Sequence, residues 1–267
     1  MISLSPQVSF IVPNFNEDPD ILLNALKSVA NQSYPNFECI VVDESTDKAS
    51  ADACRNFCNS DPRFKYFYPD SKLGLAASLN FGLRIARGEW AARFDSDDFC
   101  LPDRIKLQME YLVLHPEIDL LGTGLEIMDA HGNTIAERIY PKSHKEIEWK
   151  MHFTTSIAHP TVIYRRQSII DEGGYDSYFL NSEDLDLWLR LLNRGLRFGN
   201  LSQTLVRYRQ QNLSRQRHHW VFNLKARIKN FSRRSIFYRS LGVLAIGIWL
   251  LVPLHIQGLI FKRYIIK

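Results

Sequence analysis

Three carboxylates lie within four positions of the segment AARFDSDDFCLPDRI, residues 91–105. Asp95, Asp97 and Asp98 directly follow an apolar run that ends at Phe94. Like charges this close repel each other, so at least one carboxylate is driven toward its protonated form unless a cation binds. Oxygen-only ligands suit Mg²⁺ or Mn²⁺, which usually keep some water and share a site with substrate phosphates. The triplet therefore predicts a metal at Asp97, with Asp95 or Asp98 beside it, that neutralises a diphosphate.

On these three residues alone, an equal alternative is a plain turn whose aspartates cap the helical pattern that follows. Other phosphate-binding devices are absent from the sequence. No glycine-rich loop is followed by a phosphate-binding lysine, and no G-x-G-x-x-G follows the first apolar run. These absences disfavour kinases, P-loop enzymes and dinucleotide dehydrogenases.

The elements that must position these carboxylates begin with two apolar runs. Residues 7–15 and 37–46 each predict a buried strand that leads into a polar loop, with Pro13 and Asn14 stopping the first. Between them, apolar residues recur at helical spacing from Pro19 to Asn31, with the proline suited to a first turn. Strand, helix and strand in this order form a βαβ unit.

The alternation continues with helical segments at 49–60 and 75–86 and strand-like segments at 64–69 and 89–95. It predicts an α/β domain with a Rossmann-like, mostly parallel sheet and helices on both faces. Ligands bind at the carboxyl ends of the strands in such sheets, so the polar clusters there should meet at one edge. These clusters are Asn14 to Glu17, Asp43 with Glu44, and Asp95 to Asp98.

Two later segments depart from this alternation. Residues 115–141 indicate two strands around a turn at Ala130 to Asn133, an antiparallel excursion from the sheet. Residues 173–195 indicate a loop that feeds a helix ended by Gly195, with Ser182 as the expected cap.

Charge divides the chain into two parts. Residues 1–186 hold 17 basic and 29 acidic residues, a net −12, whereas the 16 basic residues after Asp186 have no acidic partner in that part. Residues 241–254 are an uninterrupted apolar run flanked by basic segments, shorter than the ~20 residues of a spanning helix. We therefore expect a catalytic domain at 1–210 and a basic, apolar, membrane-associating helical tail at 211–267, monotopic or re-entrant rather than spanning. A buried core helix is the alternative for this run.

The N-terminus has no basic start and no long apolar run, so it does not resemble a secretion signal. We expect the protein to be cytoplasmic and associated with the cytoplasmic face of the membrane. The four cysteines match no paired metal spacing and are interpreted as buried structural thiols.

Five blocks of the sequence resemble, in order and spacing, those of the family 2 glycosyltransferases over residues 8–208. They are VSFIVPNFNE, QSYPNFECIVVDESTD, KLGLAASLNFGLRIARGEWAARFDSDDFCLPDRIKLQ, AHPTVIYRR and GGYDSYFLNSEDLDLWLRL. The resemblance implies a GT-A fold, a nucleotide-sugar donor, a divalent metal, Mg²⁺ or Mn²⁺, and transfer with inversion at the anomeric carbon.

The resemblance also implies roles for individual residues on the donor side. The loop Pro13 to Glu17, with Phe15 where tyrosine is frequent and Asn16 beside it, resembles the segment that packs on the nucleoside. Asp43 and Glu44 resemble the acidic pair that reads the base, although aspartate is common at the second position. Further donor contacts are implied for Lys72, Gly74, Arg93, Asp95 and Ser96, and Asp97 completes the D-x-D motif as the metal ligand.

On the acceptor side, SEDLDLW matches the block whose aspartate is the general base of the family, here Asp184, with Glu183 shaping the acceptor side. The chemistry agrees, since displacement at an anomeric carbon needs a base for the acceptor hydroxyl and an electrophile for the departing diphosphate. A carboxylate near a second carboxylate and a metal site can have the shifted pKa of a base. The same segment also indicates a helix N-terminus with acidic residues in its first turn, and the two interpretations are compatible.

His159, in AHPTV, either contacts donor or acceptor or simply packs. Trp188, Leu187 and Leu191 share helical spacing and are expected in the core rather than in a sugar platform. QRHHW, residues 216–220, differs from the Q-x-x-R-W block of processive synthases and no string of spanning helices follows it. Transfer of a single sugar is therefore expected.

The sequence thus predicts a transferase that moves a hexose or N-acetylhexosamine from a UDP-sugar to a hydroxyl of a cell-surface glycan or lipid-linked acceptor, beside the membrane. A transferase acting on polyprenyl phosphate is the rival within the class. A catalytically silent sugar-nucleotide-binding scaffold is a second rival. Nucleic-acid binding through the tail is disfavoured, because the apolar run beside the charges suits a membrane. Sugar, acceptor, linkage and oligomeric state are left open by the sequence.

Overall fold

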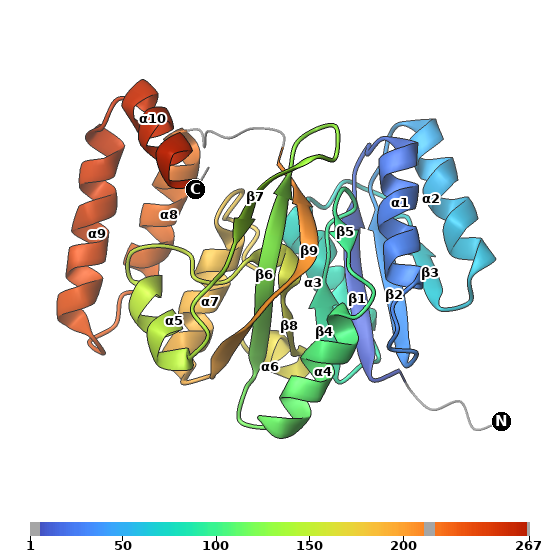
Figure 1. The fold of residues 1–267 in the computed structure, drawn as a ribbon, viewed down its shortest axis with the longest axis horizontal. Helices are drawn as coiled ribbons and strands as arrows, with labels where there is room; N and C mark the ends of the chain where they lie inside the picture. Colours follow the sequence, from blue (N-terminus) through green and yellow to red (C-terminus); the bar gives the residue numbers. More distant parts are fainter. Residues whose placement is uncertain (1–5, 211–216, 266–267) are drawn as a thin grey trace.

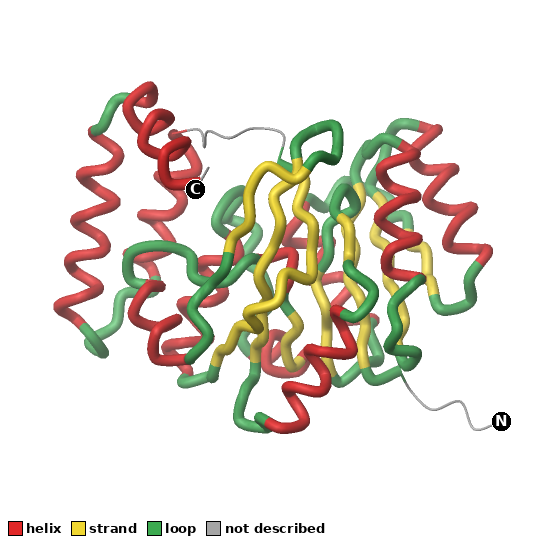
Figure 2. The backbone as a smooth tube through the Cα atoms, in the orientation of Figure 1, coloured by secondary structure: helices red, strands yellow, loops and turns green. Residues whose placement is uncertain are grey.

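The computed structural model describes residues 6–210 and 217–265. Within them, nine strands form one sheet in the order β3-β2-β1-β4-β8-β6-β9-β5, and β7 pairs with β6 (Figures 1 and 2). The strands are β1 Val8–Asn14, β2 Phe37–Asp43, β3 Phe64–Phe67, β4 Trp90–Arg93, β5 Phe99–Cys100, β6 Leu120–Met128, β7 Thr134–Arg138, β8 Ile163–Arg165 and β9 Phe198–Arg209. The helices are α1 Pro19–Ala30, α2 Lys48–Ser60, α3 Leu75–Ile85, α4 Arg104–Leu114, α5 His144–Met151, α6 Arg166–Asp171, α7 Glu183–Arg194, α8 Arg217–Lys229, α9 Ile236–Leu251 and α10 Leu254–Ile265, with a 3₁₀ turn at His159–Thr161.

The first half of the sheet matches the predicted alternation. β1 pairs in parallel with β2 and β4, and β2 pairs in parallel with β3. Strand β1 includes the two residues that were expected to stop it, because Pro13 pairs with Val42 of β2 and Asn14 pairs with Asp43. β1 and β4 are paired from Val8 with Trp90 to Ile11 with Arg93, the last residue of β4. The carboxyl ends of β1, β2 and β4 therefore meet at one edge of the sheet.

The prediction of a mostly parallel sheet is wrong for the second half of the sheet, beyond β4, where parallel and antiparallel pairs are mixed. β8 is antiparallel to both β4 and β6, and the short β5 is antiparallel to β9. β6 and β9 are parallel, and β6 with β7 forms the expected antiparallel pair around the turn at Asp129 to Asn133. The strand–helix alternation that predicts parallel pairing ends at β4, and long-range partners decide the rest.

Alternating residues of the strands fill two apolar cores, one on each face of the sheet. Phe10 and Val12 of β1 pack in a core with apolar residues of α1, α2 and α4. Ile11 between them belongs to a second core, with residues of α3, α5, α6 and α7. Helices on both faces are therefore confirmed. The four cysteines are free and buried, as expected for structural thiols.

Helices α8 and α9 lie at the end of the molecule away from β3, next to α5 and α7 (Figure 1). Buried Arg227 of α8 donates to the carbonyl oxygens of Met151, at 2.7 Å, and His152, at 2.6 Å. Asn230 donates to the carboxylate of Asp186 in α7 at 2.8 Å. A Cβ added to Gly242 of α9 would lie 1.9 Å from the carbonyl oxygen of His152, so only glycine permits this approach. The first two tail helices thus pack closely on the preceding domain.

Helix α9 also has an exposed apolar face. Leu241, Leu244, Ile248 and Leu251 are 39%, 58%, 55% and 79% exposed, at spacings that place them on one side of the helix. The alternative of a buried core helix for this segment is therefore wrong. No helix within residues 6–210 and 217–265 combines the length and apolar character needed to cross a membrane.

Candidate active site

The ends of β1 and β2 are joined by side-chain hydrogen bonds. Asn14 Nδ2 donates to Asp43 Oδ1 at 2.9 Å, and the hydroxyl of Tyr66 donates to Asp43 Oδ2 at 2.9 Å. The backbone N–H of Ser45 also donates to Asp43 Oδ1, at 3.0 Å. Asp43 is fully buried, so its carboxylate fixes this edge of the sheet.

Glu44 sets the position of the turn before α3. Its Oε2 accepts the backbone N–H groups of Leu73, at 2.5 Å, and Gly74, at 2.9 Å, and its Oε1 accepts the hydroxyl of Ser78. Gly74 has φ +81°, a conformation that L residues rarely adopt. Glu44 therefore anchors the loop that carries Lys72 beside the ends of β1 and β2.

Phe15 and Lys72 form the outer surface of this edge. The Lys72 Nζ lies 3.7 Å from the centre of the Phe15 ring, and the ring is 47% exposed. Asn16, with φ 54°, holds the loop by accepting the backbone N–H groups of Thr46 and Asp47 at 2.7 and 2.8 Å. An exposed aromatic face next to a cation is thus available on the side where the nucleoside was predicted.

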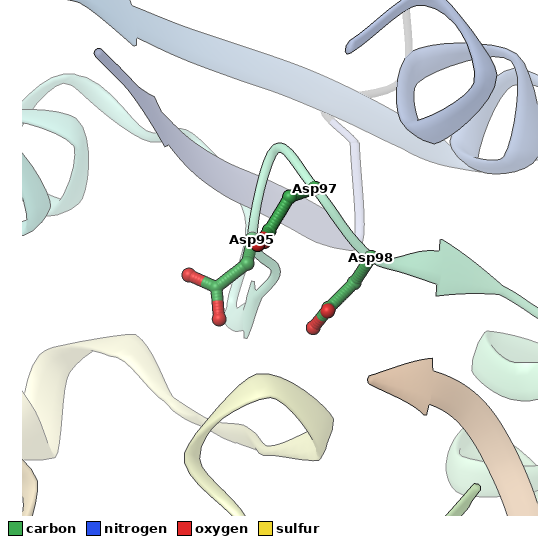
Figure 3. Close-up of side chains that lie close together, drawn as sticks. All are labelled: Asp95, Asp97 and Asp98. Atoms are coloured by element: carbon green, nitrogen blue, oxygen red, sulfur yellow. The ribbon is translucent and has the colours of Figure 1, made fainter. Parts of the chain in front are cut away.

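The loop between β4 and β5 brings the three aspartates together (Figure 3). One carboxylate oxygen each from Asp95, Asp97 and Asp98 lies within 4.8 Å of the others. Buried Arg93, at the end of β4, donates to Asp95, and the backbone N–H of Arg209 donates to Asp98 Oδ1 at 2.8 Å. Residues at the ends of β4 and β9 thus hold two of the three carboxylates in position.

The electrostatics of this cluster favour a bound cation. Burial, then the charges of Asp95 and Glu17, raise the pKa of Asp97 to about 7. Burial and the neighbouring Asp95 and Asp97 raise the pKa of Asp98 well above its usual value, and Asp98 Oδ2 is buried without a hydrogen-bond partner. A divalent cation would remove the repulsion and supply that partner. The oxygen-only set therefore fits Mg²⁺ or Mn²⁺.

Helix capping does not explain the triplet. Helix α4 begins at Arg104, and the strand β5, Phe99–Cys100, separates it from Asp98. The residue at the cap position of α4 is Asp103, whose side chain makes no capping hydrogen bond. The alternative that the aspartates cap the following helix is therefore wrong.

The second carboxylate pair lies at the start of α7. Ser182 occupies the cap position, but it has φ 67° and its buried hydroxyl has no hydrogen-bond partner, so the predicted Ser182 cap is wrong. Glu183 is 8% exposed, whereas Asp184 is half-buried. Burial and the charge of Asp184 raise the pKa of Glu183 to about 7. The left-handed Ser182 turns the chain so that both carboxylates reach one cavity.

His159 lies behind this pair. Its Nε2 is 2.9 Å from the hydroxyl of Tyr175, and its Nδ1 is 3.7 Å from Glu183 Oε1. Burial and the charge of Arg93 lower the pKa of His159 well below its usual value, so the imidazole is neutral. Trp188 packs edge-on against it and is fully buried, as are Leu187 and Leu191, which confirms the core assignment of these three.

A cavity of about 880 Å³ connects the two acidic clusters. Five of the predicted site residues line it: Arg93, Asp95, His159, Glu183 and Asp184. Leu75, the first residue of α3, reaches it from the donor edge. The other predicted donor residues, from the loop Pro13 to Glu17 and from Asp43, Glu44, Lys72, Gly74 and Ser96, do not line the cavity but surround the neighbouring edge.

The structure extends the predicted site. Asp98, one of the two residues expected beside Asp97 at the metal, has a buried carboxylate oxygen without a hydrogen-bond partner, which makes it a full member of the cluster. Tyr208 from β9, Gln210 just after that strand, Arg138 from β7 and Trp249 from α9 also line the cavity, and the sequence did not indicate them. Only the tertiary structure brings them there, because none belongs to a spaced motif.

The fold defines the class of protein. It is shared with the S. aureus TarS fragment 1–349 in complex with UDP-GlcNAc, with a TM-score of 0.70 and 19% identity over 89% of this chain and 70% of that one. The mannosyltransferase PcManGT of Pyrobaculum calidifontis, in complex with GDP-Man and Mn²⁺, gives a TM-score of 0.63 and 17% identity, covering 98% of this chain and 76% of that one. The architecture is thus that of GT-A glycosyltransferases.

Within this class, the family model of Glycosyl transferase family 2 matches residues 9–174. The O-antigen biosynthesis glycosyltransferase WbnJ of Escherichia coli is 34% identical over 197 residues, 72% of this chain and 76% of the relative. The amylovoran biosynthesis glycosyltransferase AmsE of Erwinia amylovora is 31% identical over 180 residues, 63% of this chain and 67% of the relative. The chain belongs to glycosyl transferase family 2 and is a transferase.

Proposed function

We propose that this protein is an inverting, metal-dependent glycosyltransferase that moves one sugar from a UDP-hexose or UDP-N-acetylhexosamine to a hydroxyl of a cell-surface glycan or lipid-linked acceptor. One observation carries the proposal: Asp95 of the metal-type cluster and Asp184 of the candidate base pair line the same cavity. The departing diphosphate and the attacking hydroxyl can therefore bind in the same cavity, each next to the carboxylate that acts on it.

Asp95, Asp97 and Asp98 would hold Mg²⁺ or Mn²⁺. When bound, the ion supplies positive charge that stabilises the diphosphate leaving group. Arg93 keeps Asp95 in place through their ion pair, and Arg209 does the same for Asp98 through its backbone N–H. Within residues 6–210 and 217–265, no hydrogen bond or ion pair ties the Asp97 carboxylate to another residue, and only its backbone carbonyl is held, by Arg209, which leaves the carboxylate available as a ligand.

Asp184 would take the proton of the acceptor hydroxyl. The hydroxyl oxygen then forms its bond to the anomeric carbon on the face opposite the departing diphosphate, which inverts that centre. Glu183, with its raised pKa, is protonated below neutral pH and can donate a hydrogen bond to the acceptor beside Asp184. One carboxyl group is thus kept neutral while its neighbour serves as the base.

The nucleoside of the donor would pack on the edge formed by Phe15 and Lys72. An exposed ring and a cation together suit a base and its attached phosphates. The complex of TarS with UDP-GlcNAc supports a UDP-sugar as donor, since the two chains share this fold. The O-antigen and amylovoran assignments of WbnJ and AmsE support a surface glycan as the product.

The exposed face of α9 would rest on the cytoplasmic surface of the membrane. Its apolar residues can enter the headgroup region, and exposed basic residues next to the start of α9, such as Arg233 and Arg234, favour anionic lipid. This arrangement supports the division into a catalytic domain, 1–210, and a membrane-associating segment, 211–267, although α8 also packs on the domain. It would place the cavity beside lipid-linked acceptors.

The proposal is tested with a panel of UDP-, GDP- and dTDP-sugars, comparing slow donor hydrolysis with and without Mn²⁺. Selective, Mn²⁺-dependent hydrolysis of one donor that disappears in Asp97→Ala supports the assignment and names the sugar. Tight donor binding without hydrolysis or transfer would instead indicate a silent sugar-nucleotide-binding protein. Absence of binding to every donor would overturn the proposal.

A further inference from the structure

One part of the cavity lining, here called the tail wall, comes from the tail helices α8 and α9. His219, Trp220 and Asn223 of α8 and Ala245, Ile246 and Trp249 of α9 line it. These residues lie beyond residue 174, where the family model ends. The tail therefore contributes to the substrate cavity as well as exposing an apolar face. Since Leu244 and Ile248 lie on the outer face of α9, one helix separates the cavity from that exposed surface.

Two tryptophans dominate this wall. The rings of Trp220 and Trp249 meet edge to face, with centroids 5.8 Å apart and an angle of 71° between the rings. The indole N–H of Trp249 is buried and has no hydrogen-bond partner. An unpaired buried donor is costly, so the geometry favours a ligand that brings an acceptor oxygen to it. Rigid aromatic surfaces with a few polar groups are typical of small-molecule sites.

Arg138 provides the second independent observation. It lies at the end of β7, is half-buried and lines the same cavity. Its guanidinium makes no hydrogen bond or ion pair with any residue in the described part of the chain, whereas Arg93, the other cavity arginine, is paired with Asp95. A guanidinium in this setting is suited to a phosphate or carboxylate, which it can bind through two parallel hydrogen bonds.

We propose that this wall is the acceptor subsite and that the acceptor carries an acidic group, phosphate or carboxylate, next to its sugar ring. The ring lies against Trp220 and Trp249, with a ring oxygen accepting from the Trp249 indole. The acidic group is held by Arg138, which lines the same cavity as Asp184. The inference rests on the proposed function and adds the charge class of its acceptor.

Binding to the full chain, with UDP and Mn²⁺ present, is measured with three probes. They are N-acetylglucosamine 1-phosphate, methyl glucuronide and the neutral methyl N-acetylglucosaminide. At least one acidic probe should bind about tenfold more tightly than the neutral probe, because a charge-assisted bidentate pair contributes that order of energy. The probe that shows the gain distinguishes a phosphate from a carboxylate.

Variants locate the effect. Arg138→Ala should bring the preferred acidic probe down to the affinity of the neutral one, whereas Arg138→Lys should keep part of the gain. Trp249→Ala should weaken all three probes about fivefold. Lys145→Ala and Val221→Ala serve as controls: Lys145 is an exposed cation on α5, and Val221 is an exposed apolar residue of α8 outside the cavity lining.

Equal binding of acidic and neutral probes would overturn the inference, as would an equal loss in Lys145→Ala, which would indicate only long-range attraction. Donor binding separates this failure from that of the proposed function. If the wild type binds a nucleotide-sugar with Mn²⁺ but shows no acidic preference, the inference fails and the proposed function stands. If it binds no nucleotide-sugar, the proposed function fails and the wall is no acceptor subsite.

Discussion

The imidazole of His159 lies against the carboxylate of Glu183, with 3.7 Å between Nδ1 and Oε1. Both groups are buried, and neither provides the other with an opposite charge, because the low pKa of His159 keeps the imidazole neutral. Glu183 is therefore a buried acid without a cationic partner of its own. The resulting rise of its pKa makes this residue a source of pH-dependent stability.

Glu183→Gln should stabilise the protein more at pH 8 than at pH 5. The pKa of Glu183 rises from 4.5 to about 7 in the folded protein, so the native state holds this proton more tightly than the unfolded state. The contribution of Glu183 to the free energy of unfolding is therefore fully present below about pH 4.5 and is lost as the pH rises through about 7. A neutral glutamine at this position has no such loss. The gain at pH 8 should reach at most about 3 kcal/mol.

Urea unfolding in metal-free buffer at several pH values checks this prediction. Glu110→Gln is the matched control for the loss of one carboxylate, because Glu110 is exposed on α4. A Glu183→Gln difference that is constant from pH 5 to pH 8 would show that the carboxyl group of Glu183 keeps an ordinary pKa.

Asp97→Asn should have opposite effects with and without metal. In metal-free buffer it should raise the melting temperature, because it removes one of three repelling, partly buried carboxylates. In Mn²⁺ at about 100 times the dissociation constant, the wild type should gain about 2.7 kcal/mol that the variant lacks. Thermal unfolding measures both, and an equal Mn²⁺ gain in the two proteins would exclude Asp97 as a ligand.

The carboxylate cluster shows how far sequence reasoning reaches. β1, β2 and β4 belong to successive βαβ units, so local patterns already predict that Asn14, Asp43 and Asp95 meet at one edge. The mixed half of the sheet was not predictable in this way, because β8 and β9 find their partners far along the chain. The same holds for Arg138 and Trp249, which enter the cavity only through tertiary packing. The left-handed conformation of Ser182 is not predictable from the sequence, because serine is a residue type that suits a helix cap.

Arg227→Ala should destabilise the protein by about 2–4 kcal/mol. The substitution leaves the carbonyl oxygens of Met151 and His152 without their donor inside the contact between α8 and the domain. Urea unfolding measures the change. Arg234→Ala is the matched control, since Arg234 is 56% exposed and its ion pair with Glu148 should contribute little. An equally small effect of both substitutions would mean that α8 contributes no such stability.

Leu244→Glu combined with Ile248→Glu should abolish binding to vesicles that contain anionic phospholipid. Both residues lie on the exposed face of α9, and two carboxylates there oppose insertion and repel the headgroups. Co-sedimentation gives the bound fraction, which should fall at least about tenfold. Val113→Glu with Leu114→Glu is the control, because these residues are 73% and 76% exposed on α4. Undiminished binding of the α9 variant would place the membrane contact elsewhere.

The most direct test of the account is the transfer rate of Asp184→Asn, measured with the preferred nucleotide-sugar and a hydroxyl acceptor in Mn²⁺. We predict a fall in kcat of about 10²–10⁴-fold with donor affinity unchanged, because the variant keeps the donor edge and loses only the base. Transfer at the wild-type rate would contradict Asp184 as the base. Such a result would point to an acceptor that is already an anion, such as polyprenyl phosphate.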